Sequence, residues 1–234
     1  MVLSTRSWWE TIGAYNVAVF PLQVVVVLAA VALTYLVFIR AGERSDRLMK
    51  VYLSLICAWN GLVFFLFYGR HLPGTILGAP LFILAAILFA WDVRAGKTRF
   101  RLPEARWQRY ITGSLILLSF LYPLVGLVFG HAYPESCTFG VMPCPTTVFA
   151  LALLSAALPQ VDVKVYSLLL IWALPALGKC LGALDLYEDC ILFWAGIYAL
   201  FMLIRNWIAG RRARETKQLE ILEIVEKAMD KKVG

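Results

Sequence analysis

The long blocks of apolar residues constrain this chain more than any other feature. The first block, Val17 to Phe38, contains no charged side chain. Hydrophobic residues make up 61% of the whole chain and charged residues 16%, whereas soluble domains have about 45–50% apolar and about 25% charged residues. A soluble helix bundle is excluded because such blocks leave no polar face for water. The sequence therefore predicts an all-α integral membrane protein, a polytopic helix bundle.

We expect seven membrane spans in this chain, separated by polar or Gly/Pro-containing connections. The fifth and sixth have short apolar cores, and a helix needs about twenty residues to cross a bilayer. They must therefore borrow flanking residues or be shielded by neighbouring helices. Residues 1–210 form the expected transmembrane domain, and residues 211–234 form a basic, amphipathic helical tail in the cytosol. The expected spans are residues 17–38, 51–68, 75–91, 111–129, 146–158, 165–181 and 191–208.

The basic residues orient these spans. Of the 22 Lys and Arg residues, all except Arg6, Arg70 and Lys179 fall on one side of the expected membrane. Because Lys and Arg are retained in the cytosol during insertion, we expect the N-terminus outside and the C-terminus in the cytosol. The expected location is the cell inner (cytoplasmic) membrane. The net charge of +7 then needs no nucleic-acid partner, and no nucleic-acid-binding motif is present.

We expect membrane lipids to be partners of the inner segments. The segment 92–110 interleaves aromatic residues with basic ones, which suits anionic headgroups, although cytosolic retention alone explains the charges. A membrane-protein partner or a second copy of the chain could bind the tail segment 218–229, which is amphipathic. The lipid-headgroup candidates are Lys97, Arg99, Arg101, Arg106 and Arg109.

The expected spans contain no Asp, Glu or His, which argues against a carrier that uses a carboxylate at mid-membrane. A retinal protein is excluded because residues 191–208 contain no Lys, and a haem protein because His71 and His131 lie in outer loops. We therefore expect no cofactor. Three polar residues remain as candidates to line a pore or ligand site: Asn60 in the second span, and Thr146 and Thr147 at the start of the fifth.

Four cysteines fall on the expected outer side: Cys137, Cys144, Cys180 and Cys190. An even number of cysteines on an oxidising face favours two disulfides, with three connectivities allowed, and the nearest neighbours are the first expectation. The alternatives are a metal site that uses His131 with Cys137 and Cys144, or a redox-active pair. Neither alternative has the C-x-x-C spacing that would favour it.

The outer segments also hold most of the remaining acids. Glu135, Asp185, Glu188 and Asp189 fall there, and acids in such loops are usually solvated. The alternative is a vestibule that attracts cations, since little basic charge lies on this side.

Four short segments carry a family resemblance. Phe139–Thr147, read with Phe20–Gln23, Tyr122-Pro123 and Gly130-His131, resembles a widespread, uncharacterised family of polytopic membrane proteins known as a domain of unknown function. Its most specific element is F-G-x-x-P-x-P-T. The resemblance covers most of residues 15–208. It implies a single multi-span domain in which the outer loop at residues 130–147 is functional, and it implies no activity.

A second resemblance concerns the turn after the fifth span. Leu158-Pro159-Gln160-Val161 is similar to the Pro-Gln motif of the seven-helix sugar and amino-acid carriers, which normally have one such motif in each half. The only candidate mate, Phe20–Gln23, has an extra residue and lies at the opposite membrane face. This resemblance is a minor alternative.

These observations favour a small-solute transporter or channel-like protein whose outer mouth is the Pro/Gly-rich loop before the fifth span. The competing class is a non-catalytic subunit or scaffold of a larger membrane complex. An outer-face thiol-redox or metal-binding protein is third, and thiol oxidoreduction is the only enzyme chemistry expected.

Overall fold

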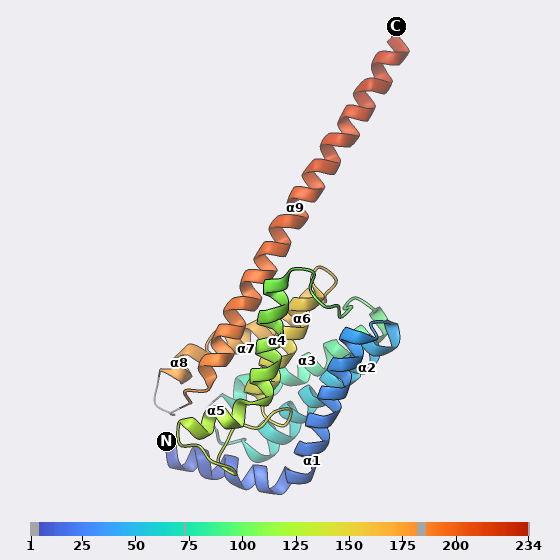
Figure 1. The fold of residues 1–234 in the computed structure, drawn as a ribbon. Coiled ribbons are helices and arrows are strands. Elements are labelled where there is room, and N and C mark those ends of the chain that lie inside the picture. The colour runs from blue at the N-terminus through green and yellow to red at the C-terminus, as the bar shows by residue number, and fades with distance from the viewer. Residues whose placement is uncertain (1–4, 73, 182–185, 234) are drawn as a thin grey trace.

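The computed structural model describes residues 5–72, 74–181 and 186–233, and among these it describes the side chains of residues 8–221. All regular structure within these ranges is helical, and no strand occurs in them. The chain forms a bundle with the N-terminus near one end, while the last helix projects far beyond the other end (Figure 1). The elements are α1 (Thr5–Ile39), α2 (Glu43–Trp59), the π-helix η1 (Asn60–Tyr68), α3 (Thr75–Ala95), α4 (Arg106–Phe120), α5 (Tyr122–Val128), α6 (Pro143–Ala157), α7 (Val163–Ala173), α8 (Ala176–Cys180) and α9 (Asp189–Val233).

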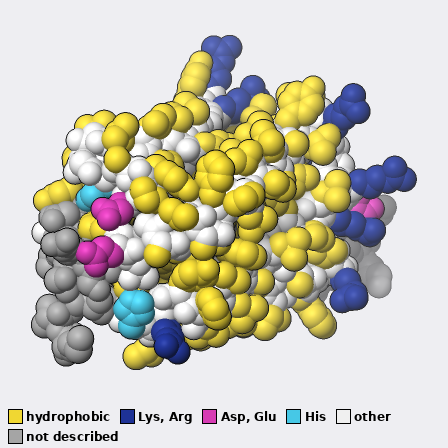
Figure 2. Space-filling view, turned by 90° about the horizontal axis from the view of Figure 1, so that it is seen from below, with side chains coloured by type: hydrophobic (Ala, Val, Ile, Leu, Met, Phe, Trp, Pro, Cys, Tyr) yellow, Lys and Arg dark blue, Asp and Glu magenta, His cyan; other side chains and the backbone are white. Residues whose placement is uncertain are grey.

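Several helices of the described chain are suited to a membrane. By length and composition five can cross one, and the bent pair of α4 and α5 makes up to six if it counts as one span. Hydrophobic side chains cover the middle of one face of the bundle, and most of the visible Lys and Arg side chains gather toward one end of that face (Figure 2). The five segments are Trp8–Ile39, Glu43–Tyr68, Thr75–Ala95, Val163–Cys180 and Asp189–Ile221.

Proline breaks two of the helices expected from the sequence. Pro123 lies in the first turn of α5, which is bent by 70° from α4. Pro175 separates α7 from α8. In both cases the ring removes a backbone N–H donor and clashes with the preceding turn, so the helix ends and a new one begins. The fourth expected span is therefore a bent pair of helices.

Helix α2 begins earlier than expected, at Glu43 within the polar connection. Glu43 and Asp46 lie in its first turn, where negative charge is favoured by the helix dipole. The Ser45 hydroxyl accepts a hydrogen bond from the Gly42 N–H at 3.0 Å. The start of this helix is therefore fixed by capping rather than by apolar content.

Helix α6 lies at the centre of the bundle. All of its residues are buried, and it contacts α2, α4, α7 and α9. It has fifteen residues and no charged side chain. A helix of this length is too short to cross the hydrocarbon core of a bilayer alone. Neighbouring helices shield α6 in this fold, which is one of the two solutions expected from the sequence.

The N-terminal part of α1 runs across one end of the bundle before the helix turns along its side (Figure 1). We call this end the outer end, after the orientation expected from the sequence, and the opposite end the inner end. Pro21 lies inside α1 and accounts for the bend. The transverse part holds the loop that precedes α6. The Tyr15 hydroxyl donates to the Val141 carbonyl at 2.7 Å, and Asn16 Nδ2 donates to the Ser136 carbonyl at 2.7 Å.

Buried carboxylates organise the opposite, inner end. Asp92 accepts hydrogen bonds from the backbone N–H groups of Lys97 at 2.7 Å and Thr98 at 3.1 Å. Asp46 accepts one from the Phe100 N–H at 3.0 Å. Helices α2 and α3 therefore hold the loop that follows α3. The three backbone N–H groups that these carboxylates bind need no water as a partner.

Replacing Lys50 with Met should destabilise the protein markedly. Lys50 Nζ donates to the Asp92 carbonyl at 3.0 Å and lies 3.7 Å from Asp92 Oδ2, with side chains 2% and 0% exposed. Removing the lysine leaves a buried carboxylate without its counter-charge, which costs about 3–5 kcal/mol. Equilibrium unfolding in mixed detergent measures the loss.

The matched control is Arg47→Met, in the same helix. Arg47 pairs with Glu43, and both side chains are exposed, at 58% and 78%, so the change should cost about 1 kcal/mol or less. Equal losses for the two variants would contradict the assignment of Lys50 as a buried counter-ion.

Candidate functional site

Two adjacent carboxylates at the start of α9 are the centre of a buried polar cluster at the outer end. Glu188 and Asp189 are both fully buried. The expectation that the outer acids are solvated is therefore wrong for these two, because the outer loops and helix ends fold over them. Glu135 is exposed as expected, whereas Asp185 lies outside the described residues.

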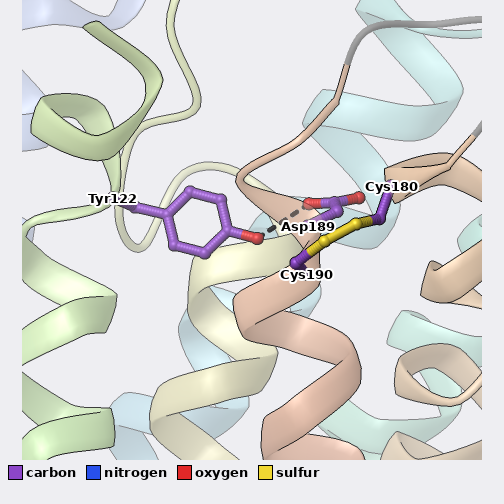
Figure 3. Close-up of a disulfide and its surroundings, with 4 residues drawn as sticks. All are labelled: Tyr122, Cys180, Asp189 and Cys190. Atoms are coloured by element: carbon purple, nitrogen blue, oxygen red, sulfur yellow. Dashed lines mark hydrogen bonds between the residues drawn. A yellow bond between two sulfur atoms is a disulfide. The ribbon is translucent and has the colours of Figure 1, made fainter. Parts of the chain in front are cut away.

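Asp189 contacts three side chains from three different helices. The Tyr122 hydroxyl of α5 donates to Oδ1 at 2.7 Å, and Figure 3 shows the ring pointing at the carboxylate. The Cys144 thiol of α6 donates to Oδ2 at 3.3 Å. The Lys179 ammonium of α8 donates to the same oxygen at 3.2 Å and lies 3.7 Å from Cys144 Sγ. These contacts satisfy a charge that would otherwise be prohibitively costly to bury.

One disulfide supports this arrangement. Cys180 and Cys190 are bonded, with their Cα atoms 5.3 Å apart, which is one of the two bridges expected between nearest neighbours. Cys180 follows Lys179 and Cys190 follows Asp189 directly in the sequence, so the bridge ties together the segments that carry the two charges (Figure 3).

The second expected bridge, between Cys137 and Cys144, is not formed, since both residues are free, buried thiols. The physical reason is that each thiol faces a different carboxylate. Cys144 faces Asp189, and Cys137 lies beside Glu188. Burial, followed by the negative charge of Glu188, raises the pKa of Cys137 well above its usual value.

Glu188 is the centre of the second half of the cluster. Its Oε2 lies 3.4 Å from His131 Nδ1, and the His131 ring stacks on Trp9 with ring centroids 3.7 Å apart. Burial is the main cause that raises the pKa of Glu188 from 4.5 to about 7, and the charge of Asp189 adds to it. The carboxyl is therefore poised to change protonation near neutral pH.

A cavity of about 270 Å³ lies beside Cys144, Lys179 and Asp189. Its walls are otherwise mostly apolar and include Phe65, Leu77, Ile171 and Trp172. The Lys179 ammonium also lies 4.5 Å from the centroid of the Trp172 ring. Leu77 and Ile171 are 53% and 52% exposed on the bundle surface, so the cavity reaches the face that lipid would cover.

The three pore-lining candidates are buried, and none of them borders this outer cavity. Asn60 Nδ2 donates to the carbonyl of Ile56 at 2.7 Å and to that of Gly140 at 3.0 Å. The Thr146 and Thr147 hydroxyls donate to carbonyls of their own helix turn, at 2.6 and 2.8 Å. Asn60 therefore holds the outer loop, and the two threonines satisfy the first turn of α6.

The alternative metal site is not assembled. Cys144 faces Asp189, whereas Cys137 and His131 face Glu188. Within the described part of the chain, no group of three or more His, Cys, Asp or Glu side chains is placed to hold a metal ion.

A second cavity, of about 450 Å³, lies at the inner end. It is bordered by the last residues of α6 and by the turn that contains Pro159-Gln160, together with Arg101 and Arg205. Among the headgroup candidates, Lys97 pairs with Asp162 at 3.0 Å, and Arg101 lies 3.5 Å from Asp46. All five candidates are exposed, so the pairs leave room for lipid contacts.

The sequence alone does not predict most of the outer cluster. It indicates Tyr122 only as part of Tyr122-Pro123, and Lys179 and Asp189 only as outer charges. The available signal was the position of each charge next to a cysteine, in Lys179-Cys180 and Asp189-Cys190. A disulfide between these cysteines necessarily brings the two charges close together.

The model of a family of unknown function, DUF6064, matches residues 5–214. The chain belongs to this family. The match covers every residue of the outer cluster and extends beyond residues 15–208 at both ends. An uncharacterised domain is what the sequence resemblance implied. Neither the curated proteins nor the solved structures provided a match.

Replacing Asn60 with Ala should destabilise this DUF6064 protein by about 1–3 kcal/mol, the cost of leaving a buried partner unsatisfied. The Gly140 carbonyl loses its side-chain donor, and Gly140 has a φ of +80° that few other residues could adopt. Thermal unfolding in detergent measures the change. An unaltered melting temperature would show that Asn60 does not hold the loop.

The stability of the protein should fall as the pH rises through about 7, because of Glu188. Its folded-state pKa is raised from 4.5 to about 7, so the protonated carboxyl favours the folded state. That contribution is complete below about pH 4.5 and is lost as the pH passes the folded pKa. Melting temperatures measured from pH 5 to pH 8 report it.

The Glu188→Gln variant provides the control for this pH dependence. Glutamine keeps the size of the side chain and removes the titration, so the slope of melting temperature against pH should become shallower. His131, Cys137 and Asp189 also face this carboxyl and are unchanged in the variant. An identical slope in both proteins would assign the pH dependence to other groups.

Proposed function

We propose that this protein is a small-solute transporter in the inner membrane, with the buried helix α6 between an outer and an inner solute site. The observation that carries the proposal is the position of the two cavities. The outer one is bordered by Pro143 and Cys144 in the first turn of α6, and the inner one by Ser155, Ala156 and Ala157 in its last turn.

The length of α6 supports this proposal. Fifteen residues at about 1.5 Å per residue give about 22 Å, whereas the hydrocarbon core of a bilayer is about 30 Å thick. Non-helical backbone therefore lies within the membrane at one or both ends of α6. Such backbone is tolerated where protein buries it or where it lines a cavity, and transporters place their solute sites beside such broken helices.

The linings of the cavities indicate the kind of solute. The outer cavity is apolar except at the end where Lys179 and Asp189 lie, and the inner one includes Arg101, Gln108 and Arg205. A small solute with an apolar body and one polar or charged end would be complementary to both sites.

Seven passes, with the N-terminus outside and the C-terminus inside, are part of this proposal. The count takes α4 with α5 as one pass and α6 as another. Two observations support it. The chain ends lie at opposite ends of the bundle (Figure 1), as expected for an odd number of passes. The Lys and Arg side chains gather toward one end (Figure 2), as expected for a cytosolic face.

Filling the outer cavity should block transport. Leu77 lines it and is 53% exposed, so Leu77→Trp can occupy the space without rebuilding the core. The purified protein in lipid vesicles is given labelled organic acids, amines and alcohols with apolar chains of different lengths. The unaltered protein should pass at least one solute faster than empty vesicles do. Leu77→Trp should lower that flux by about tenfold, equivalent to about 1.4 kcal/mol.

The matched control is Leu84→Trp. Leu84 lies two turns further along α3, is 45% exposed and does not line the outer cavity, so its flux should equal that of the unaltered protein. Transport of none of the solutes, or equal loss in both variants, would contradict the proposal.

A further inference from the structure

The Cys144 thiol lies within hydrogen-bond reach of a carboxylate that can act as its base. Its Sγ donates a hydrogen bond to Asp189 Oδ2 at 3.3 Å, and the Tyr122 hydroxyl holds the other carboxylate oxygen at 2.7 Å. A nucleophile, a base within hydrogen-bond reach and a third group that orients the base are the parts that covalent catalysis requires. Cys57, in α2, is likewise a free, buried thiol and serves as a comparison.

Positive charge is available where an oxyanion would form. The Lys179 ammonium lies 3.7 Å from Cys144 Sγ. This ammonium stabilises negative charge that develops at the reacting atoms.

The cavity beside Cys144 selects an apolar partner. It is lined mainly by aromatic and aliphatic side chains, and two of them, Leu77 and Ile171, are also exposed on the apolar surface of the bundle. A hydrocarbon chain could enter from the lipid between α3 and α7, and its polar end would then lie against Cys144, Lys179 and Asp189.

We propose that Cys144 is a nucleophile that accepts the acyl group of a fatty-acid ester bound in the outer cavity. In this step Asp189 takes the thiol proton while Sγ bonds to the ester carbonyl carbon. The carbon–oxygen bond of the ester then breaks, and the leaving alkoxide receives the proton from Asp189. The products are a thioester on Cys144 and a free alcohol, so no oxidant or reductant is needed. The inference does not depend on transport.

The test uses the purified full-length chain in detergent with p-nitrophenyl octanoate as the probe. We expect release of p-nitrophenol together with a mass increase of one octanoyl group per chain, and peptide mapping should place the group on Cys144. Because the cavity is apolar, p-nitrophenyl octanoate should react about tenfold faster than p-nitrophenyl acetate, equivalent to about 1.4 kcal/mol. Equal rates for the two esters would overturn the proposal, since a merely exposed thiol would not favour the longer chain.

Variants separate the nucleophile from its base. Cys144→Ala should abolish labelling, whereas Cys57→Ala, which removes another buried thiol, should leave it unchanged. Asp189→Asn should slow labelling by about 100-fold or more, as expected for loss of a general base. Formation of the Cys180–Cys190 bridge and normal gel-filtration behaviour verify folding, and the comparison of the two esters on the unaltered chain needs no variant. Labelling of Cys144→Ala, or label mapped to Cys137 instead, would overturn the assignment.

Discussion

Because α6 has no face toward lipid or water, the helices around it must enclose it on every side, and this requirement determines most of the architecture. Its four neighbours, α2, α4, α7 and α9, come from both halves of the chain. The polar groups at its ends must find partners inside the protein, since neither lipid nor bulk water can reach them. The threonine bonds in its first turn and the polar clusters beyond both ends meet that requirement.

The two ends of the bundle bury their charges in different ways. At the inner end, backbone N–H groups hold Asp46 and Asp92, together with Arg101 and Lys50 respectively, which suits a static clamp. At the outer end, thiols and a phenol contact the carboxylates together with a single lysine. The donors at the two ends therefore differ in kind: backbone amides are fixed by the fold, whereas the thiols and the phenol belong to side chains.

The sequence predicts the helical membrane architecture and the nearest-neighbour bridge between Cys180 and Cys190, because both depend on composition and short-range spacing. Pro123 and Pro175 indicate kinks in the fourth and sixth expected spans, but they do not predict that the helices end there, since proline is tolerated in many membrane helices and packing decides how far the chain bends. The sequence also misplaces Glu188 and Asp189 in solvent. Their burial depends on contacts with Tyr122 and Cys144, which are tens of residues away, and no local pattern encodes such contacts.

The bridge between Cys180 and Cys190 makes assembly of the outer cluster depend on the compartment. The two cysteines are separated by ten positions, and closing such a loop without a covalent tie costs conformational entropy. A newly made chain that has not yet met an oxidising environment lacks this tie, so Lys179 and Asp189 are held together less firmly. With the proposed orientation, in which the outer end faces an oxidising compartment, the residues beside Cys144 become firmly assembled only after membrane insertion, on the side where disulfides form.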